Sequence, residues 1–180
     1  RPRDWSSDVC SSDLGHTGTL DPLATGVLAL ACGRATRLVR FLTASDKDYE
    51  ATIRFGRATD TFDITGEETA RTDAEPAAAA LEPAVAQLRG DYLQMPPAYS
   101  AKNVGGRRAY DLARRDEPVV LTPVPVSVTR AEVTSFTGAT ATITLTCSAG
   151  FYVRTFAHEL GRILGTGACL EALRRTRSGD

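Results

Sequence analysis

The sequence predicts an α+β fold with a mixed, largely antiparallel central sheet flanked by helices. Residues 124–136 and 139–147 are rich in Val, Thr and Ile, and the Thr-Gly pair at 137–138 between them is typical of an antiparallel hairpin. Residues 151–164 place apolar side chains at helical spacing, and two glycines follow. Because strands and helices do not alternate strictly, a wholly parallel sheet is not expected.

The first half of the chain predicts shorter elements. The apolar run 26–32 (GVLALAC) indicates a buried strand, 34–42 has the spacing of a short helix, and 49–55 (YEATIRF) alternates like a half-buried strand. Residues 60–73, rich in Thr, Asp and Gly, indicate a loop.

Proline and glycine residues predict breaks and turns in the middle of the chain. The alanine-rich segment 74–88 contains Pro83 and predicts two short helical pieces, the second starting near that proline. Met95-Pro96-Pro97 indicates an extended segment, and Gly105-Gly106 a turn before a short helix at 108–115.

Composition places the chain among single globular domains. It has 180 residues, of which 42% are hydrophobic and 24% charged. No apolar run reaches the roughly 18 to 20 residues that span a membrane, and no signal pattern opens the sequence, so a cytoplasmic protein is expected. We also expect it to be a monomer. The scattered cysteines indicate neither disulfides nor zinc; they are Cys10, Cys32, Cys147 and Cys169.

The charge is unevenly distributed although the net charge is only −1. Residues 60–91 are acidic, whereas two later clusters are basic. Solvated surface faces would explain each cluster alone, but two basic clusters on one domain also suit a phosphate-binding face. The clusters consist of Lys102, Arg107, Arg108, Arg114 and Arg115, and of Arg174, Arg175 and Arg177.

Common catalytic motifs are not found in the sequence. His158-Glu159 is followed by Arg162 where a zinc protease would have its second histidine, and no P-loop, dinucleotide fingerprint or G-x-S-x-G motif is present. No metal or cofactor is therefore expected.

Asp21 is the carboxylate that stands out. Pro22 restricts it to an extended conformation, Gly18 lets the backbone approach a ligand, and Leu20 and Leu23 surround it with apolar surface. With no acid or base partner nearby in sequence, it suits a lone catalytic aspartate. An ordinary Asp-Pro turn is the alternative that local chemistry leaves open.

Four segments in this order resemble the TruB family of tRNA pseudouridine synthases. They are GHTGTLDPLATGVLALACGRATRLVRFL, DKDYEATIRFGRATDTFDITGE, PPAYSAKNVGGRRAYDLARR and CSAGFYVRTFAHELGRILGTGACLEALRRTRSG. The resemblance implies the pseudouridine synthase fold and, without metal or cofactor, isomerisation of uridine 55 in the T loop of tRNA. The base would be flipped out of its stack during the reaction.

The resemblance also implies roles for individual residues. Asp21 would be the catalytic aspartate, Tyr49 would stack on the uracil and help remove the proton from its carbon 5, and Arg154 would pair with the Asp21 carboxylate. His16 would fill the space that the flipped nucleotide leaves. The basic residues expected to bind the tRNA backbone are Lys102, Arg107 and Arg108.

The chain departs from the family pattern in three places. Residues 1–14 look like an adapter-derived leader, so 15–180 are expected to form a catalytic domain that lacks its first strand and helix, with apolar surface exposed. Asn103 stands where the family usually has lysine. The C-terminal RNA-binding domain is expected to be absent. Two alternatives follow: a non-catalytic tRNA-binding or tRNA-folding module, and a chain without a stable fold.

Overall fold

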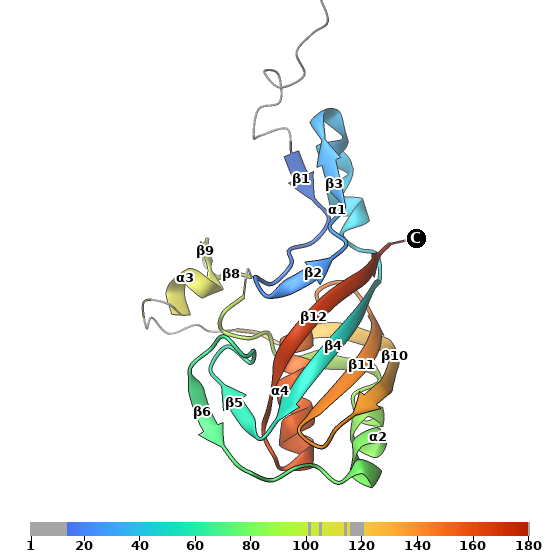
Figure 1. The fold of residues 1–180 in the computed structure, drawn as a ribbon. Helices are drawn as coiled ribbons and strands as arrows, with labels where there is room; N and C mark the ends of the chain where they lie inside the picture. The colour runs from blue at the N-terminus through green and yellow to red at the C-terminus, as the bar shows by residue number, and fades with distance from the viewer. Residues whose placement is uncertain (1–13, 101, 105, 114, 116–120, 180) are drawn as a thin grey trace, which may run out of the picture.

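A six-stranded mixed sheet forms the centre of the protein (Figure 1). The computed structural model describes residues 14–100, 102–104, 106–113, 115 and 121–179, so the expected leader lies outside the described residues apart from Leu14. All neighbouring strands are antiparallel except β2 and β12, which confirms the predicted fold class. The strand order is β2 (Ala24–Gly26), β12 (Ala168–Ser178), β4 (Lys47–Phe55), β11 (Thr140–Cys147), β10 (Val124–Phe136) and β7 (Gly90–Gln94).

Two helices cover one face of this sheet (Figure 1). The helix α4 (Val153–Leu164) contacts β12 and β4, and α2 (Ala78–Ala86) contacts α4 and β10. Phe156 and Leu160 of α4 are buried against alternate residues of β4, including Ile53. Gly165 ends α4 as predicted, because its φ of 71° is readily available only to glycine.

The predicted hairpin is confirmed, and the predicted break at Pro83 is wrong. In the turn between β10 and β11 the Thr137 amide donates to the Thr140 carbonyl at 2.9 Å. Pro83 lies inside the single helix α2, where it removes one backbone donor. Burial of Leu81, Ala84 and Val85 in the core offsets that loss.

The N-terminal region differs from the prediction for residues 26–32. Instead of one buried strand, the chain bends at Gly26 (φ 99°), and β3 (Leu30–Cys32) pairs with β1 (Leu14–His16) in a separate two-stranded arm. Leu30 is 64% exposed, so apolar composition here does not signal burial. The predicted helix 34–42 is a 3-10 segment (Gly33–Leu38) followed by one α-helical turn, α1 (Val39–Leu42).

Smaller elements complete the fold. The expected loop 60–73 contains β6 (Glu68–Arg71), which pairs with β5 (Arg57–Thr59). The predicted helix 108–115 is shorter, and Gly105 of the turn before it lies outside the described residues. This segment comprises β8 (Asn103–Val104), β9 (Arg107–Arg108) and α3 (Ala109–Ala113). No helix in the described ranges is long and apolar enough to cross a membrane.

Candidate active site

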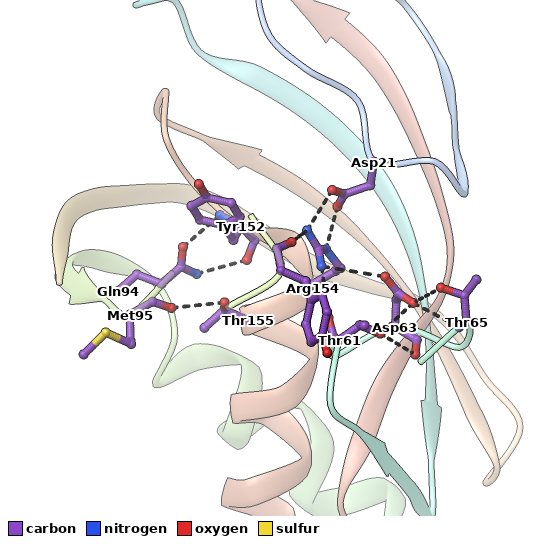
Figure 2. A network of polar contacts seen from close by, with 10 residues as sticks. Asp21, Thr61, Asp63, Thr65, Gln94, Met95, Tyr152, Arg154 and Thr155 are labelled. Atoms are coloured by element: carbon purple, nitrogen blue, oxygen red, sulfur yellow. Dashed lines mark hydrogen bonds and ion pairs between the residues drawn. The ribbon is translucent and has the colours of Figure 1, made fainter. Parts of the chain in front are cut away.

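Asp21 and Arg154 form the centre of the site (Figure 2). Asp21 lies in the loop between β1 and β2, and Arg154 is the second residue of α4. Arg154 Nε donates to Asp21 Oδ2 at 2.8 Å and Nη2 donates to Oδ1 at 2.9 Å. This two-point contact fixes the plane of the carboxylate and stabilises its negative charge.

Further contacts hold the Arg154 guanidinium. Nη1 donates to the Thr61 carbonyl at 3.0 Å, and Nη2 donates to the Tyr99 carbonyl at 2.9 Å. The Arg154 side chain is only 6% exposed, whereas that of Asp21 is 26% exposed. The arginine is thus a fixed internal support, and the carboxylate keeps an accessible edge.

Asp63 is a second carboxylate at this centre, and the sequence prediction missed it. Its Oδ2 lies 3.8 Å from Arg154 Nη1. Its Oδ1 accepts hydrogen bonds from the hydroxyls of Thr61 (3.0 Å) and Thr65 (2.6 Å) and from the Thr65 amide (3.0 Å). Asp63 therefore adds a buried negative charge on the side of Arg154 away from Asp21. The motif D-T-F-D-I-T-G looks like a plain loop, and only its paired Asp and Thr residues hint at such a cluster.

The start of α4 is anchored next to the site (Figure 2). The Gln94 side chain accepts from the Tyr152 amide at 2.8 Å and donates to the Tyr152 carbonyl at 3.1 Å. The Thr155 hydroxyl donates to the Met95 carbonyl at 3.2 Å. These contacts on both sides of Arg154 fix the position from which its side chain extends.

A cleft of about 510 Å³ opens beside the pair and is lined by Asp21, Tyr49, Lys102, Arg154 and Leu173 among others. A second hollow of about 330 Å³ also reaches Asp21 and Arg154 and includes Asp63. The structure therefore brings the three predicted catalytic residues to one cleft.

Tyr49 is buried in the wall of the larger cleft. It is 9% exposed, and this burial raises the pKa of its phenol, while hydrogen bonding to Arg175 acts in the opposite direction. The phenol is consequently in its neutral form near pH 7. Its ring offers an apolar face in the cleft together with a polar tip.

Arg175 is a fully buried cation that the sequence analysis counted only within a basic cluster. It is 1% exposed, and its Nε donates to the Val27 carbonyl at 2.7 Å and its Nη2 to the Gly18 carbonyl at 3.2 Å. These two carbonyls flank the loop that carries Asp21. Arg175 thereby fixes both ends of this loop to β12.

The other predicted residues lie apart or at the rim. His16 is exposed on β1, outside the linings of both clefts, where its Nδ1 accepts from the Gly18 amide at 3.4 Å. Lys102 lines the larger cleft and donates to the Thr122 carbonyl at 2.9 Å. Arg107 is exposed, and the backbone of Arg108 continues β9. Among the described residues, no group of three or more His, Cys, Asp or Glu side chains could hold a metal ion.

Comparison with known proteins places this site in a known family. A family model described as TruB family pseudouridylate synthase (N terminal domain) matches residues 10–153. The tRNA pseudouridine synthase B of Solibacter usitatus (strain Ellin6076) is 45% identical over 190 residues, which cover 100% of this chain and 65% of the relative. That of Pseudomonas aeruginosa (strain UCBPP-PA14) is 46% identical over 165 residues, covering 92% of this chain and 54% of the relative.

Solved structures agree with this assignment. A Cbf5-Nop10-Gar1 complex contains a chain that matches 92% of this chain with a TM-score of 0.68 and 28% identity, over 40% of its own length. An H/ACA RNP bound to a substrate RNA containing 2'-deoxyuridine gives a TM-score of 0.64 and 26% identity over 92% of this chain and 38% of the matched one. The present chain spans a little over half to two thirds of the length of its two curated relatives. On sequence and fold together, the chain belongs to the TruB family of pseudouridylate synthases.

Proposed function

We propose that the protein isomerises uridine to pseudouridine at position 55 in the T loop of tRNA, with Asp21 as the catalytic group. The observation that supports this most directly is the Asp21 carboxylate, which is held in two-point contact with buried Arg154 and keeps an edge open to a cleft that contains Tyr49. The names of the curated relatives support tRNA as the substrate.

The reaction balances without a co-reactant. The bond between uracil N1 and ribose C1′ breaks, the base turns, and a bond between C5 and C1′ forms. The proton on C5 leaves and N1 gains a proton, so substrate and product contain the same atoms. The Asp21 carboxylate supplies the nucleophile, either at the ribose or at the uracil ring, and the bond that it forms breaks again before the product leaves, which regenerates the carboxylate.

The cleft suits an extruded nucleotide. A base inside a folded tRNA loop is stacked, and removing it from the stack costs on the order of a few kcal/mol. The cleft, at about 510 Å³, lies within the size range of small-molecule sites. The Tyr49 ring offers the uracil a new stacking partner. The phenol oxygen of Tyr49 can assist removal of the C5 proton.

The same proposal covers the partner and the setting. We propose that the protein acts as a monomer on the T stem-loop in the cytoplasm and that Lys102, Arg107 and Arg108 bind the RNA backbone. His16, which is exposed beside the loop of Asp21, fills the space left in the RNA by the flipped nucleotide.

Release of tritium from a tRNA transcript labelled at carbon 5 of uridine tests the function. The chain should release tritium, the same transcript with cytidine at position 55 should give none, and Asp21→Asn should be inactive. Asp73→Asn, which removes an exposed carboxylate elsewhere, is the matched control and should keep full activity. Folded protein that binds tRNA in a salt-dependent way but releases no tritium would contradict catalysis and support a tRNA-binding module.

A further inference from the structure

The larger cleft carries an excess of positive charge. Its lining contains four cations, Lys47, Lys102, Arg154 and Arg175, but only one carboxylate, Asp21. Arg154 is paired with Asp21, and Lys102 is at the rim. Lys47 and Arg175 are therefore two buried cations without an assigned role toward a ligand.

Both cations bond only to neutral oxygens. Lys47 is 7% exposed, and its Nζ donates to the carbonyls of Ser45 (2.7 Å) and Thr43 (3.1 Å). Arg175 is 1% exposed, donates to backbone carbonyls as described above and is hydrogen-bonded to the neutral Tyr49 phenol. Within the described part of the chain, no carboxylate forms an ion pair with either residue, whereas Arg177, two residues further along β12, pairs with Asp48 at 2.8 Å.

The two cations meet at Gly18. A Cβ built on Gly18 would lie 3.3 Å from Lys47 Cε and 3.6 Å from Arg175 Nη1, so both side chains pack closely against this glycine and any side chain here would crowd Lys47. Burial, and then the positive charge of Arg175, lower the pKa of Lys47. Two like charges held together in a low-dielectric site are costly unless an anion joins them.

The strand geometry relates this corner to Tyr49. Lys47 and Tyr49 are two residues apart on β4 and therefore project from the same face of the sheet. Arg175 on β12 is the register partner of Tyr49. A nucleotide whose base stacks on Tyr49 would thus have its sugar and phosphate within reach of both cations.

We infer that Lys47 and Arg175, which lie beside Gly18 in the wall of the larger cleft, form a binding site for an RNA phosphodiester group next to the extruded nucleotide. The site rests on the proposed function and adds Lys47, a ligand contact that neither the motif nor the basic clusters indicate. A phosphodiester carries one negative charge and acceptor oxygens, which suits a lysine and an arginine that line one cleft without a carboxylate partner. A phosphate bound there compensates the buried positive charge and stabilises the flipped conformation of the nucleotide.

Chemically neutral linkages test this site. A set of T stem-loop RNAs is prepared, and each RNA carries one neutral methylphosphonate at a different linkage near the target uridine. The nucleotide on the 5′ side of the methylphosphonate carries a 2′-O-methyl group. RNAs that carry only the 2′-O-methyl group serve as controls. We expect one flanking linkage to lower kcat/KM of the wild-type chain about ten- to a hundredfold when it is neutral, the range of a lost charge-assisted hydrogen bond.

Variants then assign the contact to Lys47. Lys47→Gln keeps a donor for the Thr43 and Ser45 carbonyls but loses the charge. Its kcat/KM on native RNA should therefore be lower than that of the wild type, and the neutral linkage should lower it little further. Lys47→Arg should restore the sensitivity to that linkage. Arg162→Gln, which removes an exposed charge from α4, is the matched control and should respond to the neutral linkage as the wild type does.

Each outcome decides the inference. It is overturned if no flanking linkage matters to the wild-type chain, or if Lys47→Gln and the neutral linkage give independent, multiplicative losses. The linkage scan uses only wild-type protein, so a scan without any sensitive linkage overturns the inference even if Lys47→Gln fails to melt cooperatively. If the wild type binds the RNA but releases no tritium, the proposed function fails while RNA affinity, measured on the same set of RNAs, still tests the phosphate site.

Discussion

Asp21 and Arg154 are separated by 133 residues in the sequence and meet through two parallel hydrogen bonds of 2.8 and 2.9 Å. One residue comes from a loop between short strands, and the other from the first turn of the helix that packs on the central sheet. The position of the carboxylate therefore depends on the packing of the whole domain.

Arg154→Lys should impair catalysis although it keeps the charge. A lysine cannot form the two-point contact or reach the carbonyls of Thr61 and Tyr99 at the same time. We expect the single-turnover rate of tritium release to fall about a hundredfold or more, the effect of losing roughly 3 kcal/mol of positioning. Arg162→Lys, an exposed change in the same helix, should leave the rate unaltered.

Asp63→Asn should act through Arg154. The change keeps the size of the side chain but removes the negative charge that lies 3.8 Å from the guanidinium, and it weakens the bonds from Thr61 and Thr65. We expect a lower melting temperature, a loss of about 1–3 kcal/mol in the free energy of unfolding and a slower single-turnover rate. Glu67→Gln, an exposed change nearby, is the control; equal stability and rate in Asp63→Asn would contradict the role of this residue.

Gly26→Ala should detach the loop of Asp21 from the sheet. At φ 99° an added Cβ would lie 2.1 Å from the carbonyl oxygen of Arg175, in the parallel pairing of β2 with β12. Denaturant unfolding should show a loss of about 3 kcal/mol or more. Gly33→Ala has a similarly positive φ of 57° but no atom within 4 Å, so it should cost only about 1 kcal/mol. Equal losses in both variants would show that strain, not the clash, dominates.

His158 should make stability depend on pH. Burial lowers the pKa of His158, whose ring stacks on Phe62 at a centroid distance of 4.0 Å. The unfolded chain then binds the proton more readily than the folded chain. Stability from this residue is complete above the ordinary pKa of 6.5 and is lost as the pH falls through that value toward the lower folded pKa.

Unfolding free energies measured from about pH 7.5 to 5.5 check this prediction, since most carboxylates titrate below that window. His158→Gln should flatten the decline. An unchanged slope in His158→Gln would assign the dependence to other groups.

The sequence correctly predicted those elements in which the apolar residues of the periodic pattern are also the buried ones. The hairpin of β10 and β11 and the amphipathic helix α4 were found because their periodicity matches the faces they bury. Residues 26–32 misled the prediction because Leu28 and Leu30 are apolar but exposed. The strand β12 was not predicted, since its A-C-L-E-A-L-R-R-T-R pattern is rich in good helix formers and tertiary pairing with β4 overrides that preference.

The same limit applies to the site. The resemblance identified Asp21, Tyr49 and Arg154, and the structure brings all three to one cleft. Asp63 and Arg175 were missed as site residues because they act as buried charges that contact Arg154 and the loop of Asp21. Local sequence cannot show that burial, and charged residues of these types are mostly exposed.

The place of β12 in the sheet has a consequence for biosynthesis. All other strands of the six-stranded sheet precede β12 in the chain, yet β12 lies between β2 and β4 and supplies Leu173 and Arg175 to the cleft. A nascent chain that has left the ribosome only as far as the end of α4 already contains Asp21, Tyr49 and Arg154. It still lacks β12, the strand that pairs with both β2 and β4. The cleft therefore gains Leu173 and Arg175 only once residues 168–178 have left the ribosome and can pair between β2 and β4.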